Sequence, residues 1–306
     1  MSAQKVGKKK AKTGDKKTKG KKIERPIMAP ELKEETVILP EGKMEICVIG
    51  TEAIGCLIAA YLRKKMRKVF IVDDLDKINE IRKHGLKVEG AEGIIYLGIE
   101  AKEQLDRTVD LIIMAVKSHE IRDAIDTNRK YIDGVPILTL HNSIVVEKAI
   151  SKILGENDII SSITLFSATQ VKPGLIKHDT KGKWLIGRPF SANDEIVKQI
   201  VEEIAPAFEA VAVEDITAMK WTNLVSHTID SLAILLGKSM QETFSDMDMA
   251  RLAVMILKES FEVAEDSGIK LTPIPDSDLA GKLRKLVEEP LAEAARELST
   301  KAKELG

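Results

Sequence analysis

A glycine turn near residue 50 has the residue types and spacing to bind a diphosphate. The apolar run "EICVIG" ends at Gly50, and a helical apolar pattern follows it. Backbone N–H groups at the start of such a helix are unpaired and favour anions. Gly50, Glu52 and Gly55 occupy the three positions of G-x-G-x-x-G, and a second strand ends in Asp73, 23 residues after Gly50. This context favours a dinucleotide site over a strand-to-helix turn that binds nothing. The residues expected at the diphosphate are Gly50, Thr51, Glu52, Ala53, Ile54 and Gly55.

Glu52 weakens this expectation, because the second glycine of the pattern normally lets the backbone approach phosphate closely. A carboxylate about 5 Å from one phosphate charge costs about 3 kcal/mol at an effective dielectric near 20. The carboxylate can avoid this cost by pointing to water, or it can stabilise the start of its own helix through the macrodipole. We therefore expect a nucleotide site of reduced affinity.

Asp73 and Asp74 end the second strand and indicate which dinucleotide is preferred. A carboxylate at this position can accept hydrogen bonds from the adenosine ribose and would repel a 2′-phosphate. The charge therefore favours NAD over NADP as the cofactor. The alternative is that both are loop aspartates that start the next helix, where acidic residues are common.

A polar stripe far from the turn could supply a general acid. Lys220, Asn223, His227 and Asp230 follow one another at intervals of three, four and three residues, which places them on one face of a helix. A lysine or a histidine on a cleft-facing stripe can donate a proton, and histidine titrates near neutrality. The alternative is a stripe that faces solvent or a domain interface, with the Lys220 stem lying along apolar surface.

Strand and helix patterns alternate along the first part of the chain, which predicts a parallel sheet with crossover helices. We expect strands at 45–50, 68–73, 109–116, 136–140 and 158–165, and helices at 53–65, 75–84, 118–130, 144–154 and 193–209. A hairpin is expected over 86–99. The segments 174–179 and 183–187 are expected to pair with each other around the turn "TKGK".

Helical patterns alone follow residue 214. We expect helices at 215–236, 246–266 and 276–305, the last interrupted by Pro290. The predicted fold class is α/β, with a Rossmann-type parallel sheet domain followed by an all-helical domain. The predicted boundaries are 1–43 for a disordered Lys-rich tail and linker, 44–213 for the dinucleotide-binding domain, and 214–306 for a helical substrate or dimerisation domain.

Composition narrows the class of protein. The sequence has no apolar run long enough to span a membrane and no signal-peptide pattern. Its two cysteines and five histidines show no metal-binding or redox spacing, so we expect no metal and a cytoplasmic protein. Residues 1–25 carry a net charge of +9 and the remainder about −10. This basic tail either solubilises the chain or contacts nucleic acid weakly.

Several segments, in order and spacing, resemble the ketopantoate reductase (2-dehydropantoate 2-reductase) family. They are "GTEAIG", "AVKSHE", "HNSIVVE", "ATQVKPGLIKHDTKGKWLIG", "EDITAMKW", "GKSMQETF" and "LKESFEVAEDSGI". The resemblance implies a Rossmann-type domain joined to a helical domain. It implies hydride transfer from a reduced nicotinamide, NADH or NADPH, to a small 2-keto acid, with a lysine giving the proton. The helical domain permits a homodimer.

The resemblance also implies roles for three residues of the first domain. Lys117 in "AVKSHE" matches a lysine that contacts the cofactor, and Asn142 in "HNSIVVE" matches an asparagine where cofactor and substrate meet. Ala168 falls at a backbone contact beside the nicotinamide. The alternatives are a Lys117 that only reaches solvent and an Asn142 that caps a turn or helix.

The chain departs from the family at several of its functional positions. Asp74 replaces an arginine that binds the 2′-phosphate, in agreement with the charge argument for NAD. Counted from Trp221, the family's lysine and two asparagines become Asn223, His227 and Ser231; in the alternative register they become Thr222, Ser226 and Asp230. Neither register supplies the lysine, and the family's closing segment with a serine and a glutamate is absent.

We expect substrate contacts from Asn142, Asn223, His227, Asp230 and Ser231, and catalysis by Lys220 or His227. The second hypothesis is a catalytically impaired paralogue that binds a nucleotide or a protein partner without turnover.

Overall fold

The computed structural model describes residues 44–304 apart from Met66. These residues fall within one compact unit. The predicted tail and linker at 1–43 lie outside the described residues. None of the described helices is long and apolar enough to cross a membrane.

An eight-stranded sheet forms the centre of the α/β part, in the order β12-β11-β8-β7-β6-β1-β2-β5. Its strands are β1 Glu45–Ile49, β2 Lys68–Val72, β5 Glu100–Lys102, β6 Leu111–Met114, β7 Ile137–Thr139, β8 Ile159–Thr164, β11 Trp184–Gly187 and β12 Ala210–Ala212. Across the sheet, the six neighbouring strands β8, β7, β6, β1, β2 and β5 are all parallel, whereas β11 runs antiparallel to β8. The chain builds the sheet outward in both directions from β1, so a topological switch point lies between β1 and β6.

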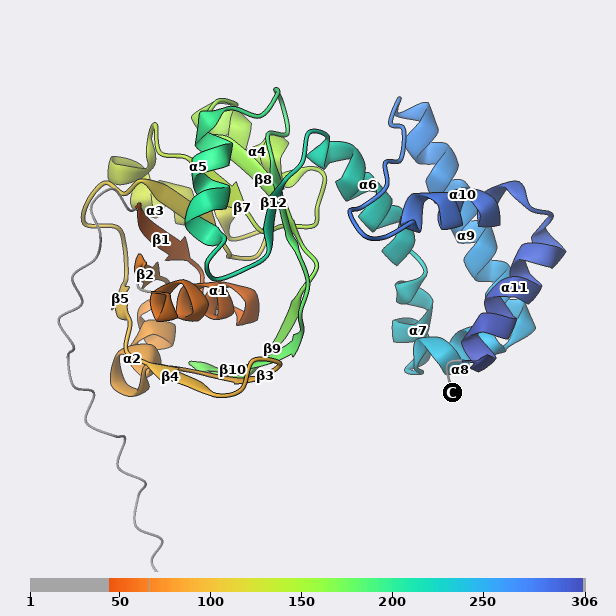
Figure 1. Cartoon of the computed structure of the whole chain (residues 1–306), viewed down its shortest axis with the longest axis horizontal. Helices are drawn as coiled ribbons and strands as arrows, with labels where there is room; N and C mark the ends of the chain where they lie inside the picture. Colours follow the sequence, from red (N-terminus) through yellow and green to blue (C-terminus); the bar gives the residue numbers. More distant parts are fainter. Residues whose placement is uncertain (1–43, 66, 305–306) are drawn as a thin grey trace, which may run out of the picture. The chain divides into compact units, whose positions relative to one another are not determined.

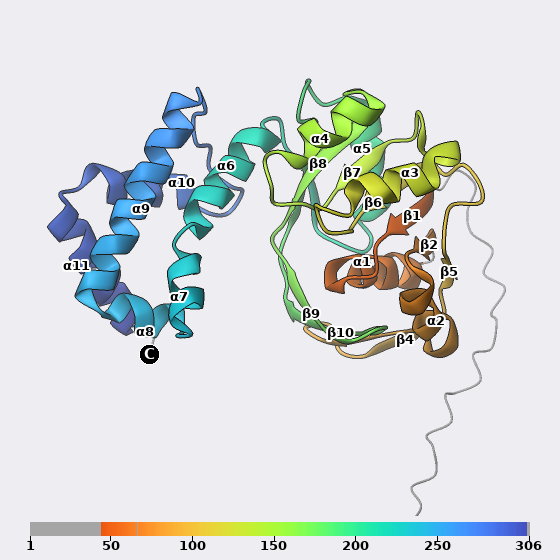
Figure 2. The same cartoon turned by 180° about the vertical axis from the view of Figure 1, so that it is seen from behind.

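Helices cover both faces of this sheet, as expected for strands that are apolar along their whole length (Figures 1 and 2). On one face lie α1 Ala53–Lys64, α2 Leu75–His84 and α5 Glu195–Ile204. On the other lie α3 Ile121–Ile132 and α4 Val146–Leu154. The predicted α/β fold class with a parallel Rossmann-type sheet is confirmed.

A second sheet of four strands, in the order β4-β3-β10-β9, packs against α1 (Figure 1). Its strands are β3 Leu86–Gly90, β4 Ile95–Leu97, β9 Ser167–Lys172 and β10 Leu175–Thr180. Because α1 lies between two sheets, all its residues from Gly55 to Leu62 are buried. The predicted hairpin over 86–99 is confirmed by the antiparallel pair β3 and β4.

The predicted pairing of 174–179 with 183–187 is wrong. Strand β10 pairs with β9 and β3, whereas β11 belongs to the main sheet and pairs with β8 and β12. The tight turn lies one strand earlier, where Pro173 and Gly174 join β9 to β10 and Gly174 has a φ of 75°. A Pro-Gly pair suits such a turn, because glycine adopts the positive φ without strain.

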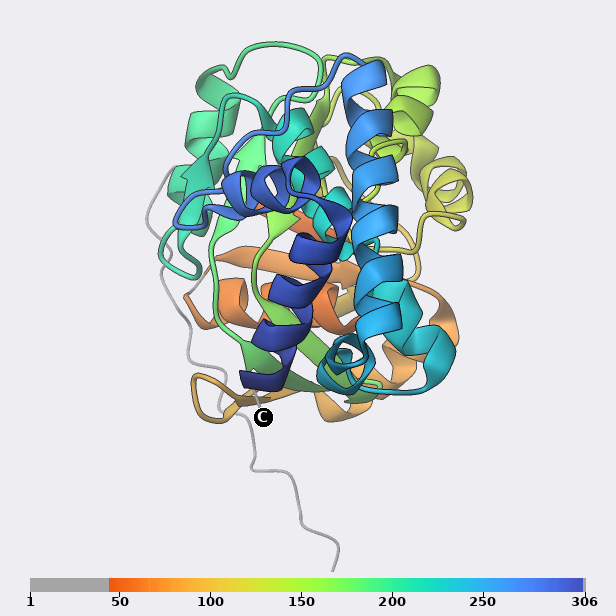
Figure 3. The same cartoon turned by 90° about the vertical axis from the view of Figure 1, so that its right-hand side faces the viewer.

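Only helices follow β12 among the described residues. They are α6 Ile216–His227, α7 Asp230–Leu236, α8 Met240–Ser245, α9 Met247–Asp266, α10 Leu279–Glu288 and α11 Leu291–Glu304. Helices α10 and α11 pack against α9, which is the long blue helix in Figure 3. The predicted helix at 246–266 and the interruption at Pro290 are confirmed.

The predicted single helix over 215–236 is wrong, because the chain breaks after His227 into α6 and α7. Three hydroxyls near the break, those of Ser226, Thr228 and Ser231, each donate to a backbone carbonyl three residues earlier. Such bonds offer the backbone an alternative to helical pairing. Asp230 therefore begins α7 and does not continue the α6 stripe.

Candidate functional site

The glycine turn between β1 and α1 has no room for side chains at Gly50 and Gly55, the first and third positions of the G-x-G-x-x-G pattern. A Cβ on Gly50 would lie 2.6 Å from the carbonyl carbon of Ala115, and φ at Gly50 is 114°. A Cβ on Gly55 would lie 2.5 Å from the carbonyl oxygen of Gly50. The turn therefore lies directly on the end of β6, at the switch point where open α/β sheets bind their ligands. Ala53 and Ile54 open α1 and are half-buried.

Asp73 holds the turn in place. Its Oδ2 accepts hydrogen bonds from the backbone N–H of Thr51 at 2.7 Å and from the Thr51 hydroxyl at 2.6 Å. Its Oδ1 accepts from the backbone N–H of Asp74 and from Lys77 Nζ. Asp73 is therefore already bonded on both oxygens, whereas Asp74 is exposed and makes no side-chain cap to α2. Of the two predicted ribose ligands, Asp74 is the one with unused acceptors.

The turn is also held by Gln170 on β9, whose amide donates to the Thr51 carbonyl at 2.8 Å. Ala168, which the sequence places beside the nicotinamide, lies two residues earlier on the same strand and is half-buried. Gln170 was not among the residues predicted from the sequence, although it lies inside the segment "ATQVKPG" that carries the family resemblance. Strand β9 is thereby attached to the glycine turn.

Glu52 forms an ion pair with Lys117. The Nζ of Lys117 lies 3.4 Å from Glu52 Oε1, and both side chains are partly exposed. Glu52 is the N-cap residue of α1, but its carboxylate accepts no capping hydrogen bond from that helix. The acidic group at the turn is therefore paired with the very lysine that the sequence analysis assigned to the cofactor. A bound diphosphate and Glu52 would compete for the Lys117 ammonium.

We expect Glu52→Gln to tighten NADH binding, because the variant frees Lys117 and removes a negative charge beside the diphosphate. An affinity gain of about tenfold corresponds to roughly 1.4 kcal/mol, a modest value that allows for solvent screening of exposed groups. Quenching of intrinsic fluorescence during titration with NADH measures the Kd.

The matched control for this prediction is Glu195→Gln. Glu195 is also an exposed glutamate at a helix start with a lysine partner, Lys198, at 3.6 Å. This variant should leave the NADH affinity unchanged. An unaltered Kd in Glu52→Gln would show that the carboxylate does not compete with the ligand.

A pocket of about 250 Å³ lies beside the turn, between the ends of β1 and β2 and helix α3. Five carboxylates line it, and no basic side chain does; they are Asp73, Asp74, Glu103, Glu120 and Asp123. Its apolar wall comes from Ile49, Val72 and Val116. A neutral adenosine suits such a pocket, whereas an additional phosphate would meet like charge.

The loop after β7 brings Asn142 to the neighbouring strand end. The Nε2 of His141 donates to the Val116 carbonyl at 2.7 Å, which ties this loop to the end of β6 beside Lys117. Burial lowers the pKa of His141, and the nearby Lys220 ammonium lowers it further. Asn142 itself is exposed and makes no side-chain hydrogen bond to any residue that the structure describes. It does not cap α4, so its amide remains available to a ligand.

Lys220 on α6 reaches this loop from below the surface. Its Nζ donates to the His141 carbonyl at 2.6 Å and forms an ion pair with Glu147 on α4. Both side chains are buried. Burial lowers the pKa of Lys220, although the carboxylate of Glu147 opposes this effect. Burial raises the pKa of Glu147, but Lys220 and the hydrogen bonds outweigh burial and hold that pKa below its usual value.

Glu147 contacts Lys220 at this candidate site, although no sequence pattern singled it out. Its Oε1 accepts from the Thr139 hydroxyl at 2.7 Å and from the Ser161 hydroxyl at 2.8 Å, in addition to Lys220. A cavity of about 80 Å³ borders both Lys220 and Glu147. The only sequence signal was an acidic residue in the first turn of a helix, which is common and unspecific.

The structure divides the predicted polar stripe. Lys220 and Asn223 are buried, whereas the His227 side chain is 61% exposed and pairs with Asp230 at the start of α7, at 2.7 Å. Ser231 is exposed and bonds to the Thr228 carbonyl. In the alternative register, Thr222 is buried and bonds to the backbone of Ala218 and Thr272. Of the two acids expected from the sequence, only Lys220 is bonded to the Asn142 loop.

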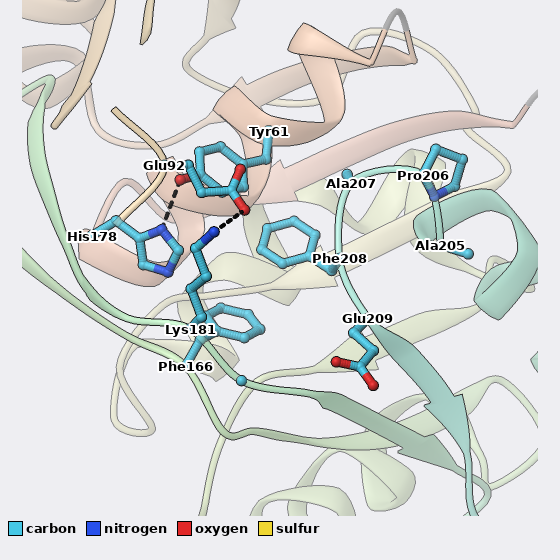
Figure 4. A pocket seen from close by; sticks show the side chains of 11 residues that line it. Tyr61, Glu92, Phe166, His178, Lys181, Ala205, Pro206, Ala207, Phe208 and Glu209 are labelled. Carbon is cyan, nitrogen blue, oxygen red and sulfur yellow. Dashed lines mark hydrogen bonds and ion pairs between the residues drawn. The ribbon is translucent and has the colours of Figure 1, made fainter. Parts of the chain in front are cut away.

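Another pocket, shown in Figure 4, shares no lining residue with either of these cavities. Its floor consists of the rings of Tyr61, Phe166 and Phe208, and the Tyr61 hydroxyl bonds to His178 Nδ1 at 2.7 Å. At its rim, Lys181 pairs with Glu92 at 3.2 Å. These polar groups already have partners and the rings pack on one another, so we interpret the pocket as a surface depression over an aromatic cluster and not as a ligand site.

Comparison with known proteins gives a consistent result. Residues 46–189 match the sequence model of the family described as "Ketopantoate reductase PanE/ApbA". A 2-dehydropantoate 2-reductase of Pyrococcus horikoshii is 28% identical over 235 residues, covering 76% of this chain and 77% of that protein. The solved structure of 2-dehydropantoate 2-reductase from Porphyromonas gingivalis W83 has a TM-score of 0.69 at 16% identity, covering 86% of this chain and 99% of that one. A ternary structure of D-mandelate dehydrogenase with NADH and anilino(oxo)acetate also has a TM-score of 0.69, at 18% identity, covering 84% of this chain and 80% of that one.

Proposed function

From these matches we propose that the chain belongs to the ketopantoate reductase family and is an NADH-preferring reductase of a small 2-keto acid. The observation that carries the proposal is the close contact of Gly50 and Gly55 with the end of β6, because a ligand-free turn does not need two positions closed to any side chain. The unused acceptors of Asp74 and the exposed amide of Asn142 lie at the ends of strands of the same sheet.

The residues divide the proposed reaction between them. The amides of the turn and Lys117 would bind the diphosphate, and Asp74 would accept from the ribose. A bound reduced nicotinamide supplies a hydride to the keto carbon. Asn142 would orient the substrate carbonyl, and the Lys220 ammonium would give its proton to the oxygen as the alcohol forms. Lys220 is then reprotonated from water.

The preference for NADH rests on the acidic pocket. A 2′-phosphate would add charge of the same sign as that of five lining carboxylates, at about 3 kcal/mol for one pair of charges 5 Å apart. The family arginine that would offset this charge is Asp74 in this chain. These features support NADH in preference to NADPH, by about 100-fold in Kd.

The deciding experiment titrates the full chain with NADH and NADPH and then measures NADH oxidation with a panel of 2-keto acids, ketopantoate included. We expect NADH to bind more tightly and at least one keto acid to be reduced. Asp74→Asn should narrow the difference in Kd between NADH and NADPH. Asp126 is an exposed aspartate outside the pocket lining, so Asp126→Asn should leave this difference unchanged.

Two outcomes would contradict the proposal. Binding of neither cofactor would exclude both a reductase and a nucleotide-binding paralogue. Tight NADH binding with no turnover on any keto acid would favour the second candidate, a paralogue that binds the nucleotide without chemistry. The ion pair of Glu52 with Lys117, and the absence of a lysine at Asn223, are the observations that favour this second candidate.

A further inference from the structure

We infer that Glu147 is the positioning residue of the active site: its carboxylate fixes the Lys220 ammonium against the loop that carries Asn142 and keeps it protonated. The inference deepens the proposed reductase function and rests on it for the role of Lys220. Nothing in the family resemblance assigned a role to Glu147. The geometry points to it because one carboxylate oxygen joins three separate elements of the fold.

The hydrogen bonds leave the carboxylate little freedom. Thr139 at the end of β7 and Ser161 within β8 both donate to Glu147 Oε1, and these two hydroxyls are fully buried. The Ser162 hydroxyl in turn donates to the Thr139 carbonyl at 2.7 Å. Glu147 is thereby fixed to the sheet by two buried hydroxyls, in strands whose other fully buried residues are isoleucine, leucine and Ser162.

Lys220 transmits this arrangement to the substrate-facing loop. Its Nζ lies between the Glu147 carboxylate and the His141 carbonyl, which precedes Asn142 directly. A lysine side chain has four rotatable bonds, so a fixed anion on one side and a fixed carbonyl on the other determine where its ammonium lies. The cavity beside Lys220 and Glu147 is also bordered by Ile144 of the same loop.

The charges that face Lys220 explain why the carboxylate matters for the proton as well as for position. Glu147 is the anion in contact with the ammonium; His141 and Lys148 are the other titratable groups of the loop and α4 near the pair. The β8 and α6 side chains that line the cavity, Ser161 and Thr217, are neutral, as are Pro189 and Phe190. Burial lowers the pKa of Lys220, and Glu147 is the one charged group at this site that opposes this loss of charge.

The first arm of the test measures the Lys220 ammonium directly. The full chain is labelled with 13C-lysine, and the Lys220 signal is identified by its loss in Lys220→Met. We expect the midpoint of its titration to fall by about one to two pH units in Glu147→Gln, because an opposite charge in contact shifts a pKa by roughly this amount. Glu147→Asp keeps the negative charge but places it farther from the ammonium, so it should give a smaller shift of the same sign. This variant replaces Glu147→Gln in the test if the glutamine variant does not fold.

The matched control is Glu203→Gln. Glu203 is a buried glutamate paired with the buried Arg67 at 2.9 Å, on α5, and it borders neither site cavity. It should leave the Lys220 midpoint unchanged. An unchanged midpoint in Glu147→Gln, or an equal shift in Glu203→Gln, would overturn the inference whether or not the protein is a reductase.

The second arm follows kcat/KM for keto acid reduction against pH. A general acid acts in its protonated form, so activity falls as pH rises through the Lys220 pKa. Glu147→Gln should move this alkaline limb to lower pH by the same one to two units, with the Kd for NADH unchanged. A fall in kcat at every pH with no movement of the limb would leave Glu147 a purely structural residue and would overturn the inference. Absence of turnover in the unmodified protein contradicts the proposed function alone, because the first arm still decides the role of Glu147.

Discussion

Gly50→Ala is expected to abolish detectable NADH binding and to lower the free energy of unfolding by about 2–5 kcal/mol. The added methyl would lie 2.6 Å from both the carbonyl carbon of Ala115 and the amide nitrogen of Val116, which are backbone atoms of a central strand end and cannot move aside. Overpacking of this kind costs roughly 1–3 kcal/mol. The φ of 114° adds a backbone cost of roughly 1–2 kcal/mol for any residue with a Cβ. Urea unfolding and NADH titration measure the two effects.

Gly134→Ala separates the clash from the backbone cost. Gly134 lies between α3 and β7 with a φ of 77°, and a Cβ there would meet nothing within 4 Å. It should therefore lose only the roughly 1–2 kcal/mol due to conformation and keep its NADH affinity. Equal losses in the two variants would show that the turn at Gly50 is not closed against β6, and would remove the main support for the nucleotide site.

The glycine turn and the strands β1, β2, β6, β7 and β8 of the main sheet could be predicted because local sequence determines them. The apolar strand that ends before Gly50, the helix that begins at Ala53 and the strand that ends before Asp73 are each specified by residues close together in the chain. Helix α2 begins and ends at the residues expected. The parallel order of the strands follows from crossovers of this length.

Strand partners could not be predicted in the same way. Strand β11 leaves β10 and joins β8, a choice that depends on which sheet edge is free and not on the sequence of β11 itself. The break between α6 and α7 lies beside three hydroxyls that bond to backbone carbonyls, and serine and threonine occur in helices too often for their presence alone to predict a break. A local signal did exist for the turn between β9 and β10, since Pro173 and Gly174 are adjacent.

The candidate site was predictable only where the family resemblance or a motif named the residue. Lys117 and Asn142 follow strand ends as expected, and the sequence alone indicated that the Glu52 carboxylate disfavours a diphosphate at the turn. Contacts between distant residues were not predictable: Glu147 and Lys220 are 73 residues apart, and Thr51 and Gln170 are 119 apart. Each contact arises from packing of distant elements, for which the spacing along the chain carries no information.

Lys220→Met is expected to have the largest effect of all, because it leaves the Glu147 carboxylate buried without its cation. Removal of one partner from a buried ion pair costs about 3–5 kcal/mol of unfolding free energy. If Lys220 is the general acid, kcat should also fall by about 10²–10⁴-fold under conditions where the variant remains folded. The matched surface control is Lys152→Met on α4, an exposed lysine with no such ion pair and outside the cavity lining, which should change stability by no more than about 0.5 kcal/mol.

The pH dependence of this loss identifies its cause. In the unmodified protein, the pKa of Glu147 is below its usual value, so the stability that this group contributes is present above the unfolded pKa and is lost as pH falls. In Lys220→Met the hydrogen bonds alone oppose burial, which is the largest effect on this group, so we expect the folded pKa of Glu147 to lie above the unfolded one. Protonation of Glu147 then stabilises the folded variant, so the deficit in unfolding free energy should be smallest near pH 4 and grow as pH rises toward 8.

The double variant Glu147→Gln/Lys220→Met keeps an oxygen acceptor for Thr139 and Ser161 without a charge, so it should recover most of the stability at pH 8. A deficit that is independent of pH, or a double variant no more stable than Lys220→Met, would mean that the loss comes from packing and not from an uncompensated carboxylate.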